Sequence, residues 1–136
     1  MSKPWPVILV AVLECLAAFT AWVVSFSLLV PGTWLDRMWE LNAPVHEAFA
    51  TQARPVATLL LVIGGLAAAA SMGLLARRVW AWLLSLAIFS INALGDLVSI
   101  LITRDFVHGL SGILIDVIFL YLLLRPNVRS FFLARR

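Results

Sequence analysis

The chain has 136 residues, of which 63% are hydrophobic and 12% are charged, whereas a soluble domain averages about 45–50% apolar and about 25% charged residues. This composition, with a mean hydropathy of +1.04, excludes a water-soluble globular domain and predicts a polytopic membrane protein. The net charge of +3 does not indicate nucleic-acid binding, because the cations lie beside several apolar runs and do not form one patch.

The first apolar run covers residues 7–30 and ends at Pro31-Gly32. Its 24 residues exceed the roughly 20 needed to cross a bilayer, so it predicts the first membrane span. The run is longer than the apolar core of a signal peptide and Glu14 interrupts it, so we expect it to be retained as a span.

In the first outer loop, residues 33–49 are predicted to form an interfacial segment, in which a short helix ends at Asn42-Ala43-Pro44 and a second short turn begins at Val45. Tryptophan on the apolar face of such a helix favours the headgroup region, and Thr33 followed by Asp36 is typical of a helix N-terminus. The apolar face consists of Trp34, Leu35, Met38, Trp39 and Leu41.

The second span is predicted over residues 55–76, with Pro55 at its start. Gly65, Ala69 and Gly73 sit four residues apart, and such a row of small residues lets another helix approach closely. The row favours tight packing within the chain, and a homodimer contact would use the same physics.

The third and fourth spans are predicted over residues 79–103 and 106–124, and the basic tail that follows is expected to lie on the inner membrane surface. The predicted fold is therefore all-α, with residues 1–136 forming a single four-helix transmembrane domain. The segments that delimit these two spans are Arg77-Arg78, Arg104-Asp105 and the tail, residues 125–136.

Four spans place both termini on the same side of the membrane. That side holds seven of the ten cations, so the positive-inside rule predicts cytoplasmic N- and C-termini. One of the seven is Lys3. We expect the other six to contact anionic lipid headgroups: Arg77, Arg78, Arg125, Arg129, Arg135 and Arg136.

A polar stripe runs along the third span. Ser85, Asn92, Asp96, Ser99 and Thr103 recur at steps of seven, four, three and four, so they share one helical face. A polar face on a membrane helix must meet protein or water, because hydrocarbon offers no hydrogen-bond partner. We therefore expect the rest of the chain to cover this stripe.

Three carboxylates lie inside predicted spans, and no Lys or Arg lies well inside any span. An ionised acid at bilayer depth costs about 2.5–3.5 kcal/mol even on the insertion scale, so each is expected to be protonated, hydrogen-bonded, hydrated or bound to a cation. The hypothesis is one internal polar site for a proton, a cation or a small amphipathic ligand. Its residues are Glu14, Asn92, Asp96, Ser99 and Asp116, with His108 nearer the outer mouth.

The alternative is that these polar residues form interhelical hydrogen bonds worth about 0.6–2 kcal/mol each. The single cysteine, Cys15, excludes a thiolate metal cluster, and two histidines on separate segments give no metal-ligand spacing. We therefore expect no metal and no cofactor. The chain also has no phosphate-binding glycine loop, nucleophile elbow or zincin helix.

Two stretches carry a resemblance: Arg-Arg-Val-Trp-Ala-Trp over residues 77–82, and Tyr-Leu-Leu-Leu-Arg-Pro-Asn-Val-Arg-Ser-Phe-Phe over residues 121–132. With the size and the four predicted spans, the segment 77–132 resembles small four-span bacterial integral membrane proteins of uncharacterised function. The size and layout are also similar to the DoxX-like group. The resemblance implies a bacterial inner membrane and carries over no catalytic residues.

Three functions compete at this point. In the first, the bundle binds or translocates a proton, a cation or a small amphipathic ligand, and a homodimer is expected because four spans are few for a transporter. In the second, the chain is an accessory subunit whose polar stripe pairs with a membrane partner. In the third, an acid donates a proton to a lipid or isoprenoid substrate, although no catalytic spacing supports an enzyme.

Overall fold

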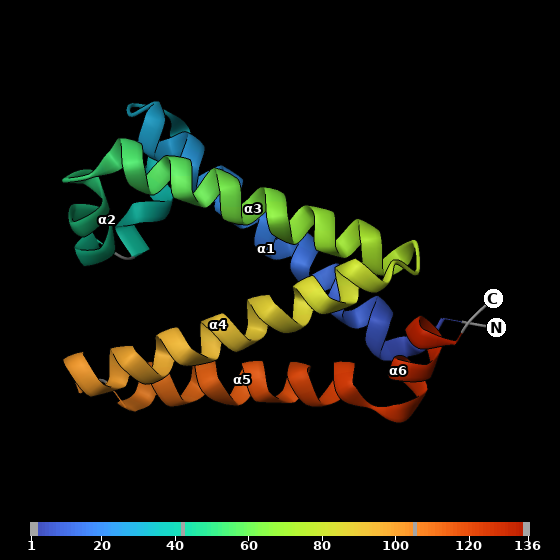
Figure 1. Ribbon diagram of the computed structural model, residues 1–136. Coiled ribbons are helices and arrows are strands. Elements are labelled where there is room, and N and C mark those ends of the chain that lie inside the picture. Colours follow the sequence, from blue (N-terminus) through green and yellow to red (C-terminus); the bar gives the residue numbers. More distant parts are fainter. Residues whose placement is uncertain (1–2, 42, 105, 135–136) are drawn as a thin grey trace. The chain divides into compact units, whose positions relative to one another are not determined.

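The computed structural model describes residues 3–41, 43–104 and 106–134, without the side chains of Val45, Thr103 and His108. All regular structure in these ranges is helical (Figure 1). The elements are α1 (Trp5–Leu29), the 3-10 helix η1 (Trp34–Leu41), α2 (Ala43–Ala50), α3 (Ala53–Leu75), α4 (Val79–Thr103), α5 (Phe106–Leu124) and α6 (Pro126–Leu133).

Within the residues described, three helices are long and apolar enough to cross a membrane: α1, α3 and α4. A fourth crossing is reached if α5 and α6 are taken as one pair, which bends by 56° at its break. The chain is therefore a multi-pass membrane protein with three or four apolar helices. The bend falls at Arg125-Pro126, where proline cannot continue the α5 ladder but is accommodated in the first turn of α6.

The third and fourth predicted spans coincide with α4 and α5, because arginine or Arg-Pro lies just outside each end of these helices. Helices α1 and α3, which correspond to the first two predicted spans, each begin two residues earlier than predicted and end one residue earlier. Pro55 occupies the first turn of α3, where its missing N–H has no helical partner to lose. Helix ends are the part of a helix that sequence patterns define least.

The chain divides into two compact units, which are described separately. The first consists of Met1–Leu13 and Ala69–Arg136 and is called the terminal unit. The second consists of Glu14–Ala68 and is called the central unit. Helices α1 and α3 contribute residues to both units.

The core of the terminal unit lies where the first turns of α1, the end of α3, the start of α4 and the tail helix α6 meet (Figure 1). The Trp82 indole donates to the Leu123 carbonyl at 3.0 Å, and the Ser71 hydroxyl donates to the Ala11 carbonyl at 2.6 Å. The buried residues are Val7, Val10, Ala11, Leu74, Ala81, Trp82, Phe89, Leu123, Val128, Phe131 and Phe132.

The basic tail forms α6, and its apolar residues pack into this core. Phe131 and Phe132 are buried, and the Phe132 ring stacks on Trp82 with a centroid distance of 6.2 Å. The alternation of arginine with apolar residues in the tail therefore corresponds to a helix whose apolar face contacts protein. The exposed Arg129 lies on the other face.

The turn between α3 and α4 is a Schellman motif built on arginine. The Arg78 N–H donates to the Gly73 carbonyl at 2.8 Å and the Arg77 N–H to the Leu74 carbonyl at 3.1 Å. Arg77 takes the left-handed conformation, with φ 57°, where glycine is usual. A Cβ on Gly73 would collide with Ala81, so this glycine permits the tight return of the chain.

In the central unit, the end of α1 packs on the start of α3 and on the outer loop. The Ser25 hydroxyl donates to the Ala57 carbonyl at 2.8 Å. Gly64 provides the close approach here, because a Cβ on it would lie 2.6 Å from Nε1 of Trp22, whereas one on Gly65 meets nothing within 4 Å. The small-residue row predicted on α3 therefore makes a close contact at Gly73 and none at Gly65.

In the predicted interfacial segment, the short helix and the turn after it correspond to two elements, the 3-10 helix η1 and the α-helix α2. Trp39, expected on its membrane-facing side, is only 7% exposed and donates from Nε1 to the Ser27 hydroxyl at 2.8 Å. The His46 ring stacks on Trp39 with a centroid distance of 4.7 Å. The buried part of the apolar face therefore contacts this aromatic cluster and not a membrane surface.

The start of η1 also differs from the predicted N-cap. The Asp36 carboxylate accepts the Gly32 N–H at 2.6 Å, and the buried Thr33 hydroxyl has no partner among the residues described. Asp36 therefore bonds back to the backbone before η1, and the Thr33 side chain does not cap the helix.

Candidate functional site

The candidate site lies between α4 and α5, which run side by side in the terminal unit (Figure 1). Arg104 closes α4 in the left-handed conformation, with φ 58°, and its N–H donates to the Ile100 carbonyl at 2.9 Å. This tight turn makes the two helices antiparallel neighbours. Every residue of the site described below belongs to this helix pair.

Two glycines on α5 set how closely the helices approach. A Cβ on Gly109 would collide with the Ile100 side chain, and a Cβ on Gly112 would collide with the carboxylate of Asp96. The Asp96 carboxyl group therefore rests against the bare backbone of α5 at Gly112. Asp116 follows Gly112 by four residues, which places it one turn along the same face of α5.

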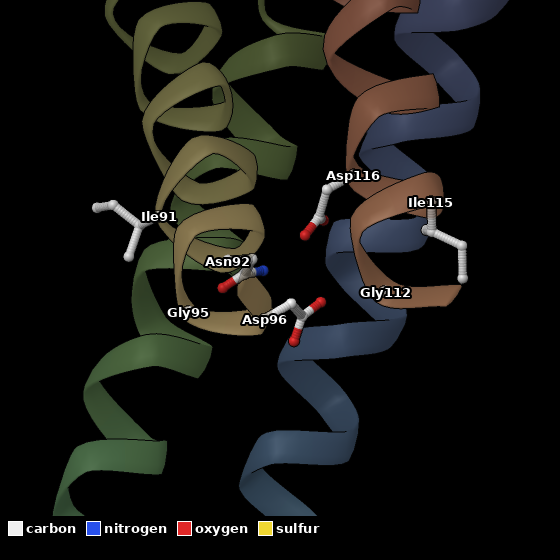
Figure 2. A pocket seen from close by; sticks show the side chains of 7 residues that line it. All are labelled: Ile91, Asn92, Gly95, Asp96, Gly112, Ile115 and Asp116. Atoms are coloured by element: carbon white, nitrogen blue, oxygen red, sulfur yellow. The ribbon is translucent and has the colours of Figure 1, made fainter. Parts of the chain in front are cut away.

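A groove of about 470 Å³ opens between the two helices at this level. Figure 2 shows Asn92 and Asp96 from α4 and Asp116 from α5 directed into the same space. The lining residues are Ile91, Asn92, Gly95, Asp96, Gly112, Ile115 and Asp116.

The two acids differ in their surroundings. Asp116 is buried, with 6% of its surface exposed, whereas Asp96 is half-buried and Asn92 is exposed. Both carboxyl groups nevertheless line the same groove. Asn92 precedes Asp96 by one helical turn and offers both a donor and an acceptor to whatever enters the groove.

The structure brings together three of the predicted site residues, Asn92, Asp96 and Asp116. Ser99 is on α4, exposed and outside the groove lining, and the His108 side chain lies outside the described part of the structure. Glu14 is 3% exposed and belongs to the central unit, so its membership of the same site stays a prediction. Ser85, at the start of the polar stripe, is fully buried in the terminal unit.

Sequence reasoning missed the part played by glycine and isoleucine. Gly95 lines the groove beside Asp96, and Ile91 and Ile115 flank it on α4 and α5 (Figure 2). The spacing of Gly109, Gly112 and Asp116 was a usable signal, because small residues three or four apart mark the face on which a neighbouring helix approaches.

The groove offers two carboxyl groups and one carboxamide in an apolar setting. Among the described residues, no group of three or more His, Cys, Asp or Glu side chains is placed to hold a metal ion. The donor set instead suits a proton shared between the acids, a cation with a partial water shell, or the cationic end of an amphipathic molecule. Comparison with protein-family models, with curated proteins and with solved structures found no match for this chain.

Proposed function

We propose that the α4–α5 groove is an intramembrane cation-binding site, with Asp96 and Asp116 as the principal ligands and Asn92 as an auxiliary ligand. The observation that carries this proposal is the convergence of two carboxyl groups and one carboxamide on one groove between apolar helices. The bound species is a proton, an inorganic cation or the cationic group of a small amphipathic molecule. Ionisable groups at bilayer depth usually serve such pathways.

The energetic argument starts from the cost of unpaired charge. A single ionised acid within a span costs about 2.5–3.5 kcal/mol on the insertion scale, and two adjacent acids add mutual repulsion. Neither Lys nor Arg occurs within the described parts of α4 or α5, so neither helix supplies a counter-charge. A proton or a cation taken up between the acids removes both the isolated charge and the repulsion.

The proposed setting is a bacterial inner membrane crossed four times, by α1, α3, α4 and α5, with cytoplasmic termini. The terminal unit supports this topology, because its core joins the first turns of α1 to the α3–α4 turn and to α6. Arg77, Arg78, Arg125 and Arg129 belong to these segments, which matches the side that carries most cations. Helices η1 and α2 would then lie at the outer surface.

The test is cation-dependent stability of the full-length protein in neutral detergent. A ligand that binds the folded state raises its free energy of unfolding by about 2.7 kcal/mol at a hundred times its dissociation constant. We expect the unfolding temperature to rise with Na⁺ or K⁺, or with falling pH if the ligand is a proton. Asp96→Asn and Asp116→Asn should each abolish that response.

The matched control is Glu47→Gln, which removes an exposed acid of α2 and should keep the wild-type response. A full response in both aspartate variants would show that the acids only hold α4 and α5 together. Loss of the response in Glu47→Gln as well would show that it reflects the overall charge of the protein.

A second function is favoured by one observation, the exposure of Asn92 on α4. Polar side chains on a span face protein or water, so a second copy of this chain would cover the stripe as an accessory or dimeric contact. The double variant Ile91→Cys, Cys15→Ala tests this in native membranes. Disulfide-linked pairs of chains would favour the dimer, and their absence under oxidation would favour an open site.

A further inference from the structure

The terminal unit contains a second cavity, of about 390 Å³, between the α3–α4 turn and the end of α6. Its lining residues are Ala76, Arg77, Arg78, Phe132 and Ala134. Two arginines therefore form the polar part of a cavity whose other walls are small or apolar. The cavity is separate from the acidic groove, because Asp96 lies about 27 Å further along α4 than Arg78.

Arg77 has a structural role in this cavity. Its Nε–H donates to the Phe131 carbonyl at 2.6 Å, and its guanidinium carbon lies 4.8 Å from the centroid of the Phe131 ring. These contacts hold a positive charge in the wall and attach the α3–α4 turn to α6. The bond uses one of the five N–H donors of a guanidinium group.

Arg78 is placed differently. It is exposed, lines the cavity and immediately precedes α4, where its side chain makes no capping hydrogen bond. The described carboxylates of the terminal unit are those of Asp96 and Asp116. Asp116 lies about 13 Å from Arg125 along the axis of α5. None of the carboxylates that the structure describes in this unit therefore lies beside Arg77 and Arg78.

We propose that this cavity binds the phosphate of an anionic phospholipid headgroup, with Arg78 as the ligand and Arg77 as the fixed positive wall. Two exposed tryptophans of the same unit indicate a lipid and not a soluble anion: Trp80 is 51% exposed on the first turn of α4, and Trp5 is 58% exposed on the first turn of α1. Tryptophan in such positions marks the headgroup level of a bilayer.

This inference does not depend on the acidic groove, and its test uses other residues. The full-length protein in a zwitterionic detergent is titrated calorimetrically with dioctanoyl phosphatidylglycerol, with dioctanoyl phosphatidylcholine and with inorganic phosphate. We expect saturable binding of phosphatidylglycerol and at least about tenfold weaker binding of the other two, since neither combines net negative charge with acyl chains. Arg78→Gln should weaken phosphatidylglycerol binding by about tenfold or more.

The matched control is Arg129→Gln, which removes an exposed arginine of α6 that does not line the cavity. This variant should bind phosphatidylglycerol within about twofold of the wild type, because an exposed charge outside the cavity contributes little. If Arg78→Gln and Arg129→Gln lose the same affinity for phosphatidylglycerol, the lipid binds to a diffuse basic surface and not to this cavity, and the proposal is overturned. Displacement of the lipid by inorganic phosphate at equal affinity would overturn the assignment to a lipid.

Folding of the variants is checked by thermal unfolding. Arg78→Gln should unfold at the wild-type temperature, because Arg78 is exposed and makes no side-chain cap. Arg78→Lys keeps the charge without the planar fork and should retain part of the affinity. Binding by Arg78→Gln at wild-type strength would also overturn the proposal.

Discussion

Gly112 is the position at which helix packing and the proposed cation site can be perturbed together. A Cβ at this residue would overlap Oδ2 of Asp96 and lie 2.7 Å from its Cγ. In Gly112→Ala, either the Asp96 carboxyl group rotates out of the groove or α5 moves away from α4. The first response removes a cation ligand, and the second loosens the contact that aligns Asp96 with Asp116.

The magnitude follows from two opposing effects. Replacing glycine by alanine inside a helix stabilises it by up to about 1 kcal/mol, whereas overpacking a close contact costs about 1–3 kcal/mol. We therefore expect Gly112→Ala to range from neutral to about 2 kcal/mol less stable than the wild type. Gly95→Ala is the matched control, because it lines the same groove and its added Cβ meets nothing within 4 Å.

The assay is thermal or denaturant unfolding of both variants in detergent, each with and without the stabilising cation. Gly95→Ala should match or exceed the wild-type stability and keep the cation response. Gly112→Ala should be about 1–3 kcal/mol less stable than Gly95→Ala and should lose the response. If the two variants are equally stable and respond equally to the cation, the seating of Asp96 on Gly112 has no role in the site.

Three further predictions concern the two units. Gly73→Ala should lower the free energy of unfolding by about 1–3 kcal/mol, because the added Cβ collides with Ala81 at the α3–α4 turn. Gly65→Ala is the control and should not lower it. Equal effects of the two variants in chemical denaturation would contradict the close approach at Gly73. Arg77→Gln should lower the free energy of unfolding by about 1–3 kcal/mol, because it removes a charged hydrogen bond to the α6 backbone. Unchanged protection of α6 in hydrogen exchange would argue against this attachment of the α3–α4 turn to α6. Trp39→Phe should lower the free energy of unfolding by about 1 kcal/mol, because the buried Ser27 hydroxyl loses the indole N–H that donates to it. Hydrogen exchange should become faster in η1 and α2 and stay unchanged in α4.

The sequence defined α4 and α5 well because charged residues interrupt the apolar runs on both sides of each helix. Arginine cannot lie in hydrocarbon without a large cost, so Arg78 and Arg104 mark the ends of α4 unambiguously. The outer loop was predicted less well, because helical spacing identifies an apolar face but does not say what covers it. Trp39 could face lipid or protein, and the structure shows that Ser27 and His46 contact it.

For the site, helical spacing predicted that Asn92 and Asp96 share a face, and this is confirmed by their common groove with Asp116. The contact between Asp96 and Gly112 could not be predicted, since it depends on the distance between two helix axes and not on spacing within either helix. The same limit applies to Gly64, which makes the close approach on α3 where the pattern favoured Gly65.

Helix α4 is bracketed by two arginines in the left-handed conformation, Arg77 before it and Arg104 at its end. Its 25 residues extend about 37 Å, compared with a hydrocarbon thickness of about 30 Å. The helix can tilt, but it cannot slide along the membrane normal by more than a few ångströms before one guanidinium leaves the polar zone. Asp96 lies about 12 Å from Arg104 along α4, and this is the distance that a cation would cover from the nearer surface to the proposed site.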